Sequence, residues 1–274
     1  MNTIRDRLWI WGHEAGAHNG RWNVGRSRMT PAEAASYLGV PNVVMVRFAN
    51  EPRPPFDQYQ LSFASLRQVI WSIIGDAGTV VNDDGGSDLE EVLRLSRAFP
   101  NVKGAIMDDF FRQPGGEPAD DSCGRYALQS LREFRRRLHA GPHSLDLWVV
   151  LYAHQLDLPV RAHLSECDGV TFWTWQARDL DRLEMNLHAA EELAPGRRMM
   201  LGCYLWDYGA DGAAMPLELM QHQCRLGLEW LEQGRIEGMI FLASCICDLG
   251  LEAVEWTRRW IAAVGDKPLM RPSA

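Results

Sequence analysis

Eight short apolar runs follow one another along the chain, and each is followed by a turn or by a stretch with helical periodicity. The runs span residues 8–11, 42–48, 68–74, 103–107, 145–152, 169–175, 199–206 and 238–243. Most of them lack regular alternation, which is typical of parallel strands buried on both faces. Eight strand–helix repeats in 274 residues predict an α/β fold, the closed (β/α)8 TIM barrel, which usually takes about 250 residues.

The stretches between the runs carry helix signals. Thr30 is placed as an N-cap, with Pro31 at the first helical position and Glu33 at the third. Amphipathic patterns predict further helices over residues 87–98, 126–139, 181–193, 216–232 and 251–263. An open doubly wound sheet is the alternative, but the turn after the first run lacks the G-x-G-x-x-G spacing of that fold. We therefore expect a single barrel domain over residues 1–274.

Charge and composition narrow the function classes. The chain has 28 Lys and Arg against 36 Asp and Glu, a net charge of −8. Nucleic-acid binding rests on clustered basic residues, so we expect no nucleic-acid partner. No run reaches the roughly 18 apolar residues of a membrane span and no secretory leader is evident, which predicts a cytoplasmic protein without membrane contact. A homo-oligomer stays open.

Six cysteines occur without a C-x-x-C pair. Zinc ligands need convergent pairs at typical spacings, so buried free thiols are favoured over a metal or a disulfide. We expect Cys245 and Cys247 to lie on a strand with their side chains on one face.

Acidic residues follow two of the predicted strands at the end where barrel enzymes carry their chemistry. Asp108 and Asp109 follow the fourth run, and Asp207 follows the seventh. Neighbouring residues on a strand point to opposite faces, so one of Asp108 and Asp109 is expected to face the barrel mouth. Asp207 is either a reacting carboxylate or a cap of the loop that follows.

Aromatic and polar side chains accompany these acids. Aromatic rings stack on the apolar face of a sugar, and polar groups bind its hydroxyls. The 11 Trp outnumber the 9 Phe and the 6 Tyr, and they serve either as a sugar platform or as interior packing. Arg47 needs an acidic partner or an anionic substrate. The predicted substrate-binding residues are Trp11, His13, Arg47, Tyr152, His154, Trp173, Trp175, Gln176 and Trp206.

Residues 104–111, 172–175 and 204–208 give the chain a broad resemblance to the TIM-barrel glycoside hydrolase superfamily. The resemblance implies two carboxyl groups flanking a glycosidic bond, one as acid and the other as nucleophile or base. The chitinase-like D-x-D-x-E pattern is absent, and Asp stands where the large retaining clan has Glu on strands 4 and 7. The separation of the carboxyl groups would decide between retention and inversion.

The sequence therefore predicts a hydrolase of O-glycosidic bonds that acts on a small carbohydrate. Its catalytic residues would be Asp108, Asp109 and Asp207, with no metal and no cofactor. Two alternatives stay open. One is a metal-dependent sugar isomerase, epimerase or lyase that uses His13, His154 and carboxylates. The other is a barrel that binds sugar without catalysis.

Overall fold

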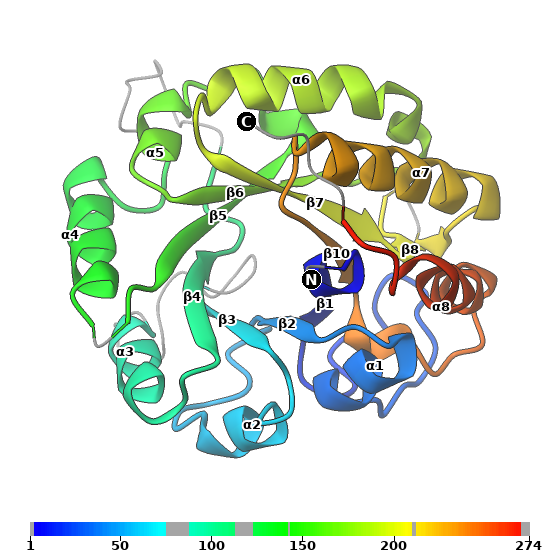
Figure 1. The fold of residues 1–274 in the computed structure, drawn as a ribbon, viewed down its shortest axis with the longest axis horizontal. Helices are drawn as coiled ribbons and strands as arrows, with labels where there is room; N and C mark the ends of the chain where they lie inside the picture. The colour runs from blue at the N-terminus through cyan, green and yellow to red at the C-terminus, as the bar shows by residue number, and fades with distance from the viewer. Residues whose placement is uncertain (1–2, 75–87, 113–122, 142, 210–211, 270–274) are drawn as a thin grey trace. The chain divides into compact units, whose positions relative to one another are not determined.

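The computed structural model describes residues 3–74, 88–112, 123–141, 143–209 and 212–269. Eight strands close into a barrel in the order β1-β10-β7-β6-β5-β4-β3-β2 (Figure 1). The pairs β1/β10, β10/β7, β3/β4 and β4/β5 are parallel. The (β/α)8 barrel fold is thus confirmed. The barrel strands are β1 Leu8–Gly12, β2 Asn42–Met45, β3 Gln68–Ile74, β4 Val102–Met107, β5 Asp146–Tyr152, β6 Gly169–Trp173, β7 Arg198–Tyr204 and β10 Gly238–Leu242.

Helices separate these strands along the chain. They are α1 Pro31–Leu38, α2 Asp57–Ser62, α3 Leu89–Ala98, α4 Leu128–His139, α5 Arg161–Ser165, α6 Leu183–Leu193, α7 Leu217–Gln233 and α8 Glu252–Val264. The predicted helices correspond to α1, α3, α4, α6, α7 and α8. The sequence did not reveal α2 and α5, because six and five residues are too few to show a helical period.

Four predicted strands end earlier in the structure than in the sequence pattern, and the first of them, β2, ends at Met45. β6 ends at Trp173, β7 at Tyr204 and β10 at Leu242. After β7 the chain enters a two-stranded antiparallel sheet of β8 Trp206–Asp207 and β9 Ala213–Ala214. After β10 it enters the 3-10 helix η4, Ser244–Ile246, which Cys247 caps, so the prediction that Cys245 and Cys247 lie on a strand is wrong.

The chain forms two compact units, which are described separately below. Unit 1 comprises Met1–Val44, Trp173–Met185 and Met199–Ala274, and unit 2 comprises Met45–Phe172 and Asn186–Arg198. In unit 1, β10 lies between β1 and β7, with Leu8 opposite Met239 and Gly238 opposite Met200. Arg5 bonds Asp266 at 2.8 Å and so links the start of this unit to its end.

Helix α1 of unit 1 begins and ends where its sequence dictates. The Thr30 hydroxyl accepts from the Glu33 backbone N–H, and the Glu33 carboxylate accepts from the Thr30 N–H at 2.8 Å, which is a complete capping box. Gly39 ends the helix in the left-handed conformation at φ 72°, which glycine adopts without a steric penalty.

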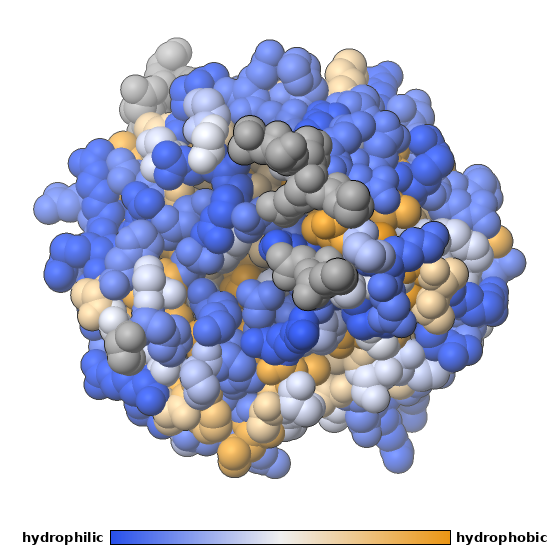
Figure 2. Space-filling view, viewed as in Figure 1, coloured by the Kyte–Doolittle hydropathy of each residue, from blue (hydrophilic) through white to orange (hydrophobic). Residues whose placement is uncertain are grey.

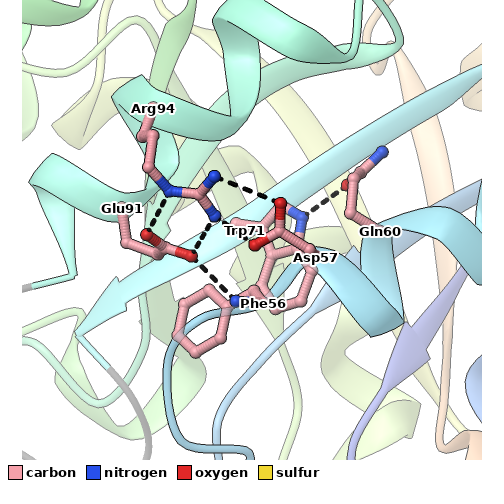
Figure 3. A network of polar contacts seen from close by, with 6 residues as sticks. All are labelled: Phe56, Asp57, Gln60, Trp71, Glu91 and Arg94. Atoms are coloured by element: carbon pink, nitrogen blue, oxygen red, sulfur yellow. Dashed lines mark hydrogen bonds and ion pairs between the residues drawn. The ribbon is translucent and has the colours of Figure 1, made fainter.

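Unit 2 contains a polar network that fixes the segment before α2 against α3 (Figure 3). The Arg94 guanidinium lies between the carboxylates of Glu91 and Asp57, and Glu91 also accepts from the Phe56 backbone N–H at 2.8 Å. The Phe56 ring stacks on Trp71 with ring centroids 4.7 Å apart. Because Arg94 and Asp57 are solvent-exposed, we attribute most of the stability here to the buried rings.

The outer surface is mainly hydrophilic on the face drawn in Figure 2. All six cysteines are buried free thiols, as predicted. Burial raises the pKa of Cys245 to about 12, so this thiol stays protonated at neutral pH. None of the helices in the described residues is long and apolar enough to cross a bilayer.

Candidate functional site

An acid cluster lies directly after β4 in unit 2, and we define it as Asp108, Asp109, Tyr152 and His154. The Tyr152 hydroxyl donates to Asp109 Oδ1 at 2.9 Å and lies 3.5 Å from Asp108 Oδ1, so one phenol reaches both carboxylates. Asp108 is buried, whereas Asp109 is partly exposed. Asp109 is therefore the carboxylate that a solvent-borne ligand can contact.

The backbone of Asp109 is held in a conformation that is rare for residues other than glycine. Its φ is +46°, in the left-handed region. The Asp109 N–H donates to Asp108 Oδ1 at 2.9 Å, and the Asp109 carbonyl accepts from the Arg125 guanidinium. Such strained residues persist only where their surroundings fix them, and they cluster at functional sites.

The expectation that only one of Asp108 and Asp109 would face the barrel mouth rests on strand alternation. β4 ends at Met107, so alternation does not extend to the two acids. The left-handed turn at Asp109 instead brings both carboxylates to one hydroxyl. Nothing in the sequence pattern marks the residue at which the chain leaves the strand.

His154 completes the acid cluster from the 3-10 helix η2, Ala153–Gln155, which follows β5. Its imidazole stacks on the Tyr152 ring, with centroids 5.3 Å apart and planes 11° from parallel. Partial burial lowers the pKa of His154, and the nearby Asp109 opposes that shift. The imidazole is thus biased towards its neutral form.

Arg47 is the other predicted polar residue in unit 2, and the structure supplies the acidic partner that it required. Its Nη1 lies 3.1 and 2.9 Å from the two carboxylate oxygens of Asp88, and both side chains are buried. Its Nη2 donates to the Asn50 carbonyl at 2.7 Å. Asp88 is not among the predicted site residues, although its place just before α3 is a typical position for an acid.

Unit 1 contains a group of seven side chains with aromatic rings in contact, which we call the aromatic cluster. They are Trp11, His13, His18, Trp173, Trp175, Tyr204 and Tyr208.

Two predicted substrate-binding tryptophans lie in the interior of this aromatic cluster. Trp11 and Trp173 are 2% and 1% exposed, with ring centroids 5.1 Å apart in an edge-to-face arrangement. The Trp11 indole N–H donates to His13 Nε2 at 3.1 Å, and Trp173 packs on Tyr204 at 5.1 Å. These rings pack against one another, which is the interior-packing alternative of the sequence analysis.

His18 and Tyr208 belong to the same cluster but were not among the predicted site residues. His18 Nδ1 lies 3.0 Å from the Tyr208 hydroxyl, and both residues are buried. Burial, His13 and Arg21 together lower the pKa of His18 to about 2, so its imidazole is neutral at physiological pH. Burial also raises the pKa of Tyr208, which keeps the phenol protonated.

The remaining predicted residues of unit 1 are Trp206 and Asp207, which form β8, and Trp175 and Gln176, which follow β6. Asp207 Oδ1 accepts from the backbone N–H of Ala177 at 3.2 Å and of Gly209 at 3.0 Å. The Trp206 indole donates to the Trp22 carbonyl at 3.1 Å. Trp175 and Gln176 are partly exposed, and the Trp175 ring packs edge-on to Tyr204 at 5.7 Å.

The structure thus places the predicted residues in two groups, one in each unit. Asp108, Asp109, Tyr152 and His154 meet in unit 2, as the acid cluster. Within the residues described, no group of three or more His, Cys, Asp or Glu side chains could hold a metal ion.

The sequence matches no protein-family model and no curated protein. Solved structures with the same fold include a xylanase A mutant from P. fluorescens subsp. cellulosa in complex with xylopentaose, at 10% identity and TM-score 0.53 over 86% of each chain. Active domain 2 of a Pyrococcus furiosus chitinase shares 13% identity, with TM-score 0.56 over 88% of this chain and 85% of that one. The Legionella pneumophila ChiA C-terminal domain shares 10%, with TM-score 0.56 over 94% and 98%.

Proposed function

We propose that the protein hydrolyses O-glycosidic bonds of a small carbohydrate and that the acid cluster carries the reaction. The observation that supports this most directly is the pair of adjacent carboxylates joined by the Tyr152 hydroxyl at the C-terminal end of a barrel strand. Barrel enzymes place their catalytic residues at this end. The neighbours described above include a xylanase bound to xylopentaose and chitinases, which adds support for a carbohydrate substrate.

Within this proposal the two acids after β4 have different tasks. Asp109 is partly exposed and is the reacting carboxylate. Asp108 is buried and accepts from the Asp109 backbone N–H, so it is a positioning residue. Tyr152 fixes the orientation of the Asp109 carboxylate through its 2.9 Å hydrogen bond.

Asp207, in unit 1, is the further acid that the sequence predicts to be catalytic, and we propose that role for it on the sequence alone. Its Oδ1 is held by two backbone N–H groups, and no hydrogen bond to Oδ2 occurs among the described residues. Asp207→Asn separates a reacting role from a capping role, because the amide oxygen can still accept both backbone bonds while the negative charge is lost.

The test compares Asp109→Asn, Asp108→Asn and Asp207→Asn on 4-nitrophenyl glycosides and on xylo- and chito-oligosaccharides. We expect Asp109→Asn to lower kcat by about 10²–10⁴-fold, the usual contribution of a positioned acid or base. Asp57→Asn is the matched control, because this exposed acid pairs with Arg94 on the surface and lies outside the acid cluster. Full activity in both Asp108→Asn and Asp109→Asn would contradict the proposal.

A further inference from the structure

A groove of about 480 Å³ lies between α7 and α8, within unit 1. Figure 1 shows these two helices beside each other on the outer layer. Trp256 and Trp260 of α8 line one side of the groove. None of its lining residues belongs to the acid or aromatic cluster, so the groove is a separate feature of the molecule.

The rings of Trp256 and Trp260 are nearly parallel, and we call this pair the platform. They are four residues apart on one helix and so project from the same face. Their ring centroids are 6.2 Å apart with planes 19° from parallel, and both rings are partly exposed. The buried Phe241 ring packs edge-on to Trp260 at 6.3 Å, which restrains the platform from behind. Among the residues described, neither indole N–H has a hydrogen-bond partner.

The opposite side of the groove comes from α7 and is mostly polar. The side chains that line it are Gln221, Arg225, Glu229 and Glu232, together with the apolar Leu228. Arg225 Nη1 lies 3.9 Å from Glu229 Oε2, Arg225 Nη2 lies 3.3 Å from His222 Nδ1, and Glu229 Oε1 accepts from Gln233 at 3.1 Å. The lining carries one guanidinium and two carboxylates, a net negative charge, so the groove disfavours an anionic ligand.

We propose that this groove binds a neutral oligosaccharide, with sugar rings on the two indoles and sugar hydroxyls on the α7 side chains. Aromatic rings supply a flat apolar surface for the C–H face of a sugar, and a few planar polar groups supply orientation. The volume lies in the range of small-molecule sites, about 300–1,000 Å³. The ligand class follows from the proposed function, but binding at the groove does not require turnover.

The experiment uses the full chain labelled with 5-fluorotryptophan and carrying Asp109→Asn to prevent turnover. The ¹⁹F resonances of Trp256 and Trp260 are assigned from the Trp256→Phe and Trp260→Phe variants. Xylopentaose, chitopentaose and cellopentaose are then added in turn. We expect saturable shifts of these two resonances with at least one sugar, and a rise in Kd of at least tenfold for Trp256→Ala in calorimetry.

Two further variants keep the test decisive. Glu229→Gln combined with Glu232→Gln weakens binding without removing an aromatic ring, which covers the case in which Trp256→Ala does not fold. Tyr37→Ala is the control, because Tyr37 is an exposed aromatic that packs on Arg258 of α8 outside the groove. The affinity of the Tyr37→Ala variant for the sugar should equal that of the Asp109→Asn protein without this change.

Three results would overturn the proposal. One is the absence of a shift at Trp256 and Trp260 with all three sugars, and another is binding that Trp256→Ala leaves unchanged. The third is a dimer that Trp256→Ala dissociates, which would assign the groove to a second copy of the chain. If the wild type hydrolyses a sugar but the Trp256 and Trp260 resonances do not shift, only the groove proposal is contradicted. If these resonances shift but the wild type hydrolyses none of the sugars, only the proposed function is contradicted.

Discussion

The acid cluster and the aromatic cluster both use residues at strand ends, yet their polar atoms have different surroundings. In the acid cluster one phenol reaches two carboxylates, and the Asp109 side chain is partly open to solvent. In the aromatic cluster the polar atoms of His13, His18 and Tyr208 bond to neighbouring rings and are buried.

Under the proposed function, this difference separates the place of the reaction from a packed interior. Strained backbone at Asp109 and a shared hydroxyl are features of a preorganised site. Edge-to-face rings such as Trp11 and Trp173, at 2% and 1% exposure, mainly contribute stability. Changes in the aromatic cluster should therefore alter the free energy of unfolding, and changes in the acid cluster should alter turnover.

The largest effect on stability is expected from Gly202→Ala, which tests whether the aromatic cluster is close-packed. A Cβ at Gly202 would lie 2.0 Å from Cδ2 of Trp173, far inside van der Waals contact. The ring cannot retreat, because Trp11 and Tyr204 pack on it. We expect a loss of about 3 kcal/mol in the free energy of unfolding, measured by urea denaturation.

Gly25→Ala in the same unit is the matched control for that prediction. A Cβ there would meet only the Leu249 side chain at 3.7 Å, an ordinary contact, so stability should stay within about 0.5 kcal/mol. Equal stability of Gly202→Ala and Gly25→Ala would show that the aromatic cluster is loosely packed.

A matched pair of Tyr→Phe changes tests the comparison directly. Tyr152→Phe removes the hydroxyl that orients Asp109, and we expect kcat to fall about tenfold or more with little change in stability. Tyr208→Phe removes the 3.0 Å hydrogen bond to His18 in a buried place. It should cost about 1–3 kcal/mol of stability and leave kcat of the folded enzyme unchanged.

Steady-state kinetics and thermal unfolding of both variants provide the readout. The reverse pattern, with Tyr208→Phe inactive at full stability and Tyr152→Phe fully active, would exchange the roles that we assign to the two clusters.

The fold could be predicted from the sequence because strands buried on both faces appear as continuous apolar runs. The run 68–74 and the capping box at Thr30 and Glu33 each correspond to an element of the structure. Short elements escaped detection, as α5 shows. Strand ends were also misplaced where aromatic residues continue past the sheet, as at Trp175 and Trp206.

The site could be predicted only in part, because residue type does not report exposure. The tryptophans in predicted strands were expected either to bind sugar or to pack, and Trp71 and Trp148 are fully buried. Asp108 and Asp109 could be proposed from the sequence because they are two adjacent acids directly after an apolar run. Their shared contact with Tyr152 depends on one backbone turn, which leaves no pattern in the sequence.

A last effect, spread over two pH units, concerns the pH dependence of stability, through His18 of the aromatic cluster. Its pKa is lowered from 6.5 to about 2 in the folded state, chiefly by burial. Below pH 6.5 the unfolded chain therefore binds a proton that the folded chain does not, and stability falls as the pH falls. From pH 7 to pH 5 this single group should cost about 2 kcal/mol.

His18→Gln should reduce that pH-dependent loss, whereas His188→Gln, at an exposed histidine of α6, should leave it unchanged. The measurement is the free energy of unfolding of wild type and both variants at pH 7, 6 and 5. The difference between wild type and His18→Gln should grow with each step in pH, because other titrating groups cancel. Parallel pH profiles for all three proteins would mean that His18 takes up its proton in the folded state. The aromatic cluster would then be open to water, and the contrast with the acid cluster would be lost.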